Sequence, residues 1–203
     1  MSITIHLTDV AKRFGRQWLY QNVSSVLQMG KSYALTGNNG SGKSTLLQII
    51  YGYQTPTKGK VEYLRNKEKL NQSEWIKYIS YTAPYIDLPD ELTLEEQLNF
   101  HFQFKSIVSG FTIDDVIEAC WLTESRHKKI KHFSSGMKQR VKLAQVFFAD
   151  TPVYLLDEPC TNLDERGIEW YRQEIISRKN NRLIVIASNQ AFEYDFVDEQ
   201  IKI

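Results

Sequence analysis

Residues 37–44 read Gly-Asn-Asn-Gly-Ser-Gly-Lys-Ser, a spacing typical of a loop that wraps around phosphate groups. Its three glycines let the backbone aim successive N–H groups at one anion, and a helix that begins there adds the positive end of its dipole. Lys43 supplies a positive charge for the β- and γ-phosphates, and Ser44 supplies a hydroxyl ligand for Mg²⁺. The loop therefore predicts that a nucleoside triphosphate binds with Mg²⁺ at Gly37, Asn38, Asn39, Gly40, Ser41, Gly42, Lys43, Ser44 and Thr45.

The residues on either side fit the elements that must position this loop. Residues 32–36 are mostly apolar and read as a buried strand that enters it. Residues 44–51 read as an apolar helix that leaves it, and Gly52 is a residue that favours a left-handed helix end. The alternative is a glycine-rich turn without a ligand, and these flanks argue against it.

A second pair of candidate residues ends another apolar run, Val153–Glu158. The run reads as a short strand in the interior of a parallel sheet, with two acids at its end. Asp157 can help to hold Mg²⁺, and Glu158 can polarise the water that attacks the γ-phosphate. A lone Asp-Glu pair at a strand end is commonly just solvated, but its occurrence beside a phosphate loop favours catalysis.

Residues 133–144, between these two sites, resemble the signature segment of ATP-binding cassette (ABC) ATPases, usually written Leu-Ser-Gly-Gly-Gln. The resemblance implies that Ser134 and Gly136 face phosphate, and the departures from the pattern are Phe133, Ser135 and Met137. Taken alone, Ser-Ser-Gly at a helix start is more often an ordinary N-cap. Ser134 lies 24 residues before Glu158, where the family carries its signature, and this favours the second anion site.

Two further residues match the family. Asp164 follows the second acid closely and looks like the aspartate of the D-loop, which in the family contacts the phosphate loop of the second subunit. Phe14 lies 29 residues before Lys43, in the place of the aromatic ring that stacks on adenine. A lone phenylalanine near an N-terminus is more often a core residue, and Trp18 and Tyr20 are rivals for the stacking role.

Two positions depart from the family. Asn189 stands where the family places a switch histidine at the end of the next strand. Asparagine can donate a hydrogen bond to a γ-phosphate oxygen but has no titratable charge, so slower hydrolysis is expected. Pro84 stands where relatives have a glutamine that senses Mg²⁺ and water, and proline has no side-chain oxygen to coordinate a metal.

The resemblance implies an α/β fold that forms one ABC-type ATP-binding domain over residues 1–203. The expected parts are a P-loop NTPase (RecA-like) core with a mostly parallel sheet, an N-terminal antiparallel β-subdomain and an inserted α-helical subdomain that carries the signature segment. Their expected bounds are about 31–54, 75–84 and 150–203 for the core, 1–30 and 55–70 for the antiparallel β-subdomain, and 85–149 for the helical subdomain.

Residue patterns support these parts. Alternating apolar residues predict short antiparallel strands between Ile3 and Leu35. Thr93 and Glu96 form a capping box that predicts a helix, although the phenylalanines at 100, 102 and 104 alternate as in a strand. Residues 113–121 predict a second helix with two acids near its positive end.

The resemblance implies an ATP-binding and ATP-hydrolysing subunit that powers an ABC-type membrane transporter. Two such cassettes, expected to form a homodimer, would hold ATP between the phosphate loop of one and the signature segment of the other. A separate transmembrane permease would dock on the helical subdomain, where Tyr85, Leu88, Leu92 and residues 100–104 either line the groove or fill the local core. The alternative function is an ATP-gated binding or regulatory cassette with weak hydrolysis, since the histidine and the glutamine are both replaced.

Composition and cysteine spacing limit the partners and the cellular compartment that we expect. The 25 Lys and Arg residues nearly balance the 24 Asp and Glu residues, so no nucleic-acid partner is expected. Cys120 and Cys160 lack CxxC spacing and fit a reducing cytosol. No apolar stretch approaches the roughly 18 residues of a membrane span, so we expect a cytoplasmic subunit that is peripheral to the membrane through its permease. Missing heptads and the single phosphate loop argue against an ABC ATPase of DNA repair or translation.

Overall fold

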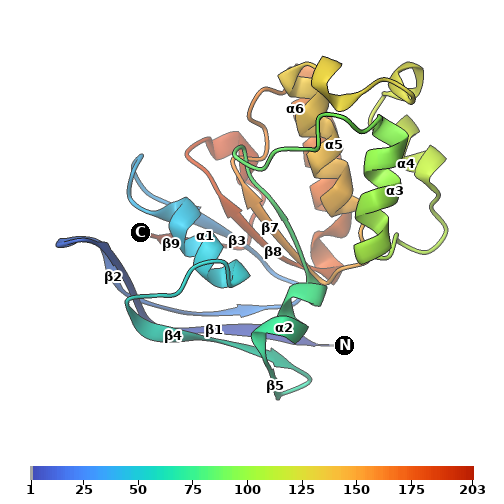
Figure 1. The fold of residues 1–203 in the computed structure, drawn as a ribbon. Helices are drawn as coiled ribbons and strands as arrows, with labels where there is room; N and C mark the ends of the chain where they lie inside the picture. The colour runs from blue at the N-terminus through green and yellow to red at the C-terminus, as the bar shows by residue number, and fades with distance from the viewer. Residues whose placement is uncertain (1) are drawn as a thin grey trace.

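The computed structural model of the chain describes residues 2–203 and contains two sheets (Figure 1). The first sheet is antiparallel, in the order β2-β1-β4-β5. Its strands are β1 (Ile3–Phe14), β2 (Gln17–Gln28), β4 (Lys58–Arg65) and β5 (Glu68–Leu70). The prediction of short strands was wrong here, because β1 and β2 each run for 12 residues around register shifts near Val10. Such bulges let a long strand bend and continue past a break in the apolar alternation.

The second sheet contains five strands, in the order β6-β7-β8-β3-β9, and all of its described pairings are parallel. Its strands are β3 (Ser32–Thr36), β6 (Ile79–Thr82), β7 (Val153–Asp157), β8 (Leu183–Ala187) and β9 (Glu199–Lys202). The carboxyl ends of β3, β7 and β8 meet at one edge, because parallel neighbours end on the same side. The phosphate loop, the acid pair and Asn189 follow these three ends, so the topology gathers them.

The described chain also contains six α-helices and five short 3₁₀ helices. The α-helices are α1 (Lys43–Tyr51), α2 (Gln72–Trp75), α3 (Leu94–Phe104), α4 (Ile113–Ala119), α5 (Ser135–Phe147) and α6 (Glu165–Arg178). The end of α1 at a left-handed Gly52 and the Thr93–Glu96 capping box of α3 are both confirmed. None of these helices, within residues 2–203, combines the length and apolarity of a membrane span.

The helical region settles one ambiguity and corrects one boundary. The alternating phenylalanines belong to α3, where Phe100 and Phe104 contact each other edge to face across one turn. The predicted helix over residues 113–121 ends earlier, at Ala119, because Trp121 adopts a left-handed φ of 55°. A capping box of Thr112 and Asp115, which we did not predict, begins that helix.

Alternate residues of β7 divide the buried core into two clusters. Tyr154 and Leu156 belong to the cluster that includes α3, α4, α5 and α6, whereas Val153 and Leu155 belong to the cluster that includes α1 and the antiparallel sheet. Figure 1 shows α1 and the antiparallel sheet on one side of the parallel sheet and helices α3 to α6 on the other. The parallel sheet is thus covered on both faces, as its nearly continuous apolar strands require.

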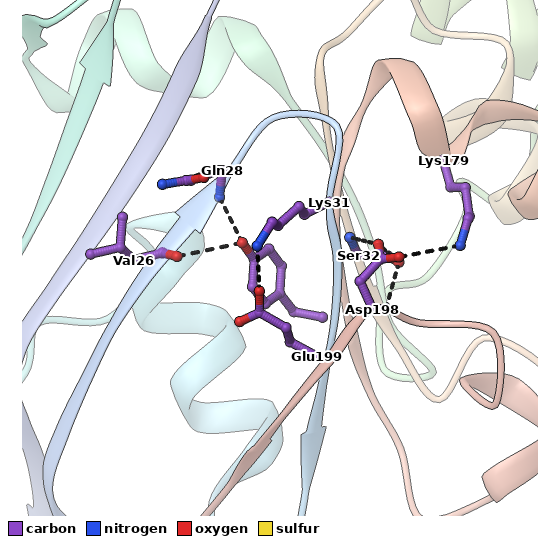
Figure 2. Close-up of polar contacts among 8 residues, drawn as sticks. Val26, Gln28, Lys31, Ser32, Lys179, Asp198 and Glu199 are labelled. Atoms are coloured by element: carbon purple, nitrogen blue, oxygen red, sulfur yellow. Dashed lines mark hydrogen bonds and ion pairs between the residues drawn. The ribbon is translucent and has the colours of Figure 1, made fainter.

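A polar cluster at the amino end of β3 joins the strands at the edge opposite to the phosphate loop (Figure 2). The Ser32 backbone N–H and hydroxyl donate to Asp198 Oδ2 at 2.8 and 2.6 Å, and Lys31 pairs with Glu199 at 2.6 Å. The Tyr33 hydroxyl accepts a 3.0 Å hydrogen bond from a backbone N–H of β2. These contacts join β3, the strand that carries the phosphate loop, to β9 in its own sheet and to β2 in the antiparallel sheet.

Candidate functional site

The phosphate loop leaves polar groups unpaired at the start of α1. Gly42 is the N-cap, with φ at 103° and without a side-chain cap hydrogen bond. A Cβ at Gly42 would lie 2.5 Å from Leu19 Cδ2, so only glycine fits this approach. The Ser41 hydroxyl is buried without a hydrogen-bond partner. Free helix N–H groups and an unpaired hydroxyl are what an anion needs at a helix N-terminus.

Lys43 is 7% exposed and lies inside the loop. Its Nζ donates to Gly37 O at 3.0 Å and to Asn38 O at 3.1 Å. Burial lowers the pKa of Lys43, and the nearby charges of Glu158 and Asp157 raise it in part. The ammonium therefore lies among neutral carbonyl oxygens, and its remaining N–H can donate to a phosphate oxygen.

Ser44 and Asp157 meet as the predicted pair of metal ligands. Ser44 Oγ donates a 2.9 Å hydrogen bond to Asp157 Oδ1, while Asp157 Oδ2 is buried without a hydrogen-bond partner. Burial raises the pKa of the Asp157 carboxyl to about 6. Two hard oxygen donors, one of them an orphaned carboxylate oxygen, fit Mg²⁺, which commonly takes few protein ligands beside phosphate oxygens.

Glu158 lies between two hollows. One, of about 250 Å³, is also lined by Phe14, Lys43 and Ser44, and the other, of about 490 Å³, is also lined by Asn189. The backbone of Glu158 has a φ of 41°, and its N–H donates to Ala187 O at 2.9 Å. A left-handed non-glycine residue held by a neighbouring strand carries local strain of the kind that gathers at functional sites.

The position of Phe14 separates it from its rivals. Phe14 is 56% exposed and lines the hollow of the phosphate loop. Trp18 instead lies beneath Arg13 and Lys58, whose cationic groups stand 5.6 and 5.5 Å from its ring. Tyr20 is only 8% exposed and belongs to the core. The Phe14 ring also has a cation near it, Lys12 Nζ at 5.2 Å, but of the three aromatic residues only Phe14 lines the hollow of the phosphate loop.

The signature segment forms a separate hollow of about 250 Å³, which contains no residue of the phosphate loop. Ser134 caps α5 by accepting a 3.2 Å hydrogen bond from the Met137 N–H, and Ser135 is the first helical residue. A Cβ at Gly136 would lie 2.8 Å from Asn162 O, so close packing alone already requires glycine there.

Asp164 lies beside the signature segment of its own chain. It lines the same hollow, and its carboxylate caps α6 by accepting a 2.8 Å hydrogen bond from the Gly167 N–H. The predicted contact of Asp164 with the phosphate loop of a second subunit therefore involves a side chain that already has a structural role.

The loop after β6 contains a functional candidate that sequence reasoning missed. Gln48 Nε2 donates a 2.6 Å hydrogen bond to the Tyr85 hydroxyl, which is also hydrogen-bonded to the Tyr81 hydroxyl. The sequence alone predicts Tyr85 only as an apolar residue that lines the docking groove or fills the local core. The available signal was the spacing of Gln48, one helical turn after Ser44 on the same face of α1.

Cys160 is a packing residue, as its environment shows. It is 6% exposed, and burial raises the pKa of its thiol well above the ordinary value. Its backbone N–H donates to Glu193 Oε1 at 2.7 Å. Glu193, a buried acid that sequence reasoning did not single out, thus fixes the loop that follows Glu158.

The family model described as "ABC transporter" matches residues 20–161 of this chain. The chain belongs to the ABC transporter family. Among its relatives, the uncharacterized ABC transporter ATP-binding protein YcbN of Bacillus subtilis is 28% identical over 99% of this chain and 66% of its own length. The cytochrome c biogenesis ATP-binding export protein CcmA of Rhizobium etli is 34% identical over 79% of this chain and 76% of its own length.

A solved ABC cassette has the same fold. The dimeric post-hydrolysis structure of a cassette bound to ADP and phosphate superposes with a TM-score of 0.82, over 98% of this chain and 94% of that one, at 23% identity. The family and the predicted fold class, a P-loop NTPase α/β fold, are confirmed. The chain is an ATP-binding subunit of the ABC type, and it spans about two thirds of the length of YcbN.

Proposed function

We propose that this ABC cassette binds Mg-ATP and hydrolyses it as one half of a pair, and that it powers a membrane transporter. The observation that carries the proposal is that the phosphate loop and the signature segment line separate hollows of the same chain. The phosphate loop with Phe14 lines one, and the signature segment lines another that shares no residue with it. Each chain thus offers two half-sites, which a second cassette, expected to be another copy, would complete.

Each residue has a role in this composite site. Lys43 and the loop N–H groups bind the β- and γ-phosphates, and Ser44 and Asp157 would hold Mg²⁺. Bound Mg²⁺ would neutralise charge on the phosphate oxygens. Glu158 polarises the attacking water, and Asn189 donates a hydrogen bond to the γ-phosphate. The N-terminus of α5, with Ser134 and Gly136, presents its N–H groups from the second copy.

The permease would dock on the helical face of the cassette. Phe100 and Phe104 are 49% and 72% exposed, and Tyr85 is 52% exposed, whereas Leu88 is 6% exposed and belongs to the core. Of these candidate docking residues, the aromatic Tyr85, Phe100 and Phe104 are exposed, whereas Leu88 is buried. Large exposed aromatic side chains are typical of protein interfaces. This contact would keep the subunit at the cytoplasmic face of the membrane.

A second candidate function is an ATP-gated cassette that pairs but hydrolyses little. Asn189 favours it, because the residue lines the hollow beside Glu158 and cannot carry a proton there. Single-turnover hydrolysis of the wild type and of Asn189→His distinguishes the two functions. Fast wild-type hydrolysis that the histidine does not change supports the ATPase, whereas slow hydrolysis that histidine accelerates supports the gated cassette.

A further inference from the structure

The loop after β6 holds a hydroxyl group in a fixed place. The Tyr85 hydroxyl accepts from Gln48 Nε2 and is bonded to the Tyr81 hydroxyl. The Gln48 amide is itself fixed, because Gln54 Nε2 donates to Gln48 Oε1 at 2.5 Å. Side chains from α1 and β6 thus converge on the Tyr85 oxygen, although the Tyr85 side chain is 52% exposed. A surface tyrosine whose oxygen is held on two sides has a defined orientation.

This hydroxyl lies beside the candidate metal ligands. Ser44 and Gln48 are four residues apart in α1, so they lie on one face of the helix. Ser44 bonds Asp157 there, and β6, which carries Tyr81, is the parallel neighbour of β7, which ends at Asp157. Because Gln48 donates to the Tyr85 hydroxyl, this hydroxyl is held one helical turn along α1 from the Ser44–Asp157 pair.

The tyrosine has the chemistry that Pro84 lacks. A phenol hydroxyl both donates and accepts hydrogen bonds, as a glutamine amide does, whereas proline offers neither in its side chain. Tyr85 follows Pro84 directly, in the loop that comes after β6. The loop therefore brings a polar group to the metal side of the site from the position next to the one where the family carries glutamine.

We propose that Tyr85 is the positioning residue that faces nucleotide-bound Mg²⁺ in this chain, in place of the missing glutamine. The inference rests on the proposed function, because it requires that Ser44 and Asp157 hold the metal. Held by Gln48 and Tyr81, the hydroxyl supplies a hydrogen-bonding group to the polar surroundings of the ion. Mg²⁺ should therefore raise the affinity for ATP more in the wild type than in a chain that lacks this hydroxyl.

The test measures the affinity of the full chain for a non-hydrolysable ATP analogue by calorimetry, once with MgCl₂ and once with EDTA. The variant is Tyr85→Phe. The matched control is Tyr51→Phe, since Tyr51 stacks on Tyr81 at 4.9 Å and forms no hydrogen bond with the described Gln48–Tyr85–Tyr81 cluster. We expect Tyr85→Phe to reduce the gain in affinity from Mg²⁺ about tenfold, the size of one lost hydrogen bond to a charged group. Its affinity in EDTA should stay at the wild-type value.

Two further results sharpen the test. Tyr51→Phe should keep the full gain from Mg²⁺, and Tyr85→Gln should recover most of it, because the amide restores a donor and an acceptor. An unchanged gain in Tyr85→Phe would overturn the inference, as would an equal loss in EDTA, which would mean damage to the phosphate loop. A wild-type chain that binds no analogue under either condition would instead contradict the proposed function.

Discussion

The phosphate loop and the signature segment both contain glycine at a helix N-terminus, yet the two helix ends are capped differently. At α1, Gly42 provides no side-chain cap, and the Ser41 hydroxyl is buried without a partner. At α5, Ser134 caps its own helix, and Gly136 is required by the approach of Asn162 O. The first end presents unpaired polar groups that a ligand can satisfy, whereas the second is capped by its own side chain.

This difference predicts a division of labour. Changes at the phosphate loop should affect the affinity of a single chain for ATP. Changes at the signature segment should affect the stability of α5 and the turnover of the pair, and should leave the ATP affinity of one chain unchanged.

Glu158→Gln should produce the largest effect on turnover. Removal of the carboxylate that polarises water should lower the ATPase rate about a thousandfold, while ATP affinity stays the same, because the amide keeps the shape of the side chain. Steady-state phosphate release and calorimetry measure the two quantities. Glu124→Gln, on the exposed surface, is the control. Near-normal turnover in Glu158→Gln would remove Glu158 from the site.

Lys43→Ala should come next. The loss of a buried ammonium from the phosphate site should weaken ATP binding about a hundredfold, since charge-assisted hydrogen bonds are the strong ones. Lys31→Ala, at the opposite end of β3, should bind ATP as the wild type does. Equal affinities in the two variants would show that the ligand does not lie in the phosphate loop.

The free energy of unfolding should depend on pH through His101, which joins α3 to the helix that carries the signature segment. His101 on α3 donates to Gln145 O on α5 at 3.2 Å, and burial lowers its pKa from 6.5 to about 4. Between these values the unfolded chain binds a proton that the folded chain refuses, so the free energy of unfolding falls as pH falls through this window, by about 2 to 3 kcal/mol at most.

Urea unfolding at pH 7 and pH 4.5 measures this loss, with His101→Gln as the variant. Asp157, whose pKa is raised, opposes the trend in both proteins, so the difference between them isolates His101. The variant should lose less stability in acid than the wild type does. His127→Gln, at an 80% exposed histidine, should behave as the wild type. An unchanged pH dependence in His101→Gln would contradict the assignment.

The smallest expected effect comes from removing the N-cap of α5, Ser134. Ser134→Ala should destabilise the chain by about 1 kcal/mol and also slow turnover. Thr112→Ala removes an equivalent cap from α4 and should cost about the same stability, with turnover unchanged. Thermal unfolding and ATPase rates of the two variants check the comparison. If both variants turn over equally fast, Ser134 is only a cap.

Local patterns predicted the local parts of this molecule well. The phosphate loop, the left-handed Gly52 and the Thr93–Glu96 capping box involve residues within a few positions of one another, so their spacing alone indicates their structure. The lengths of β1 and β2 were missed because most side chains of β2 are exposed or half-buried, and these strands are fixed by pairing with each other.

The missed parts of the candidate site depend on contacts across the sheet. Tyr85 reaches Gln48, 37 residues away in the sequence, and Cys160 reaches Glu193, 33 residues away. Nothing in the local pattern around Tyr85 distinguishes a held hydroxyl from an exposed aromatic residue. The choice of Phe14 over Trp18 and Tyr20 likewise required the position of β1 beside the phosphate loop.

The most direct test of the composite site is the mass of Glu158→Gln in analytical ultracentrifugation, with and without Mg-ATP. Two half-sites per chain predict a single chain without nucleotide and a pair of chains when ATP is bound and not hydrolysed. A chain that is saturated with Mg-ATP and remains single at every protein concentration would contradict the account.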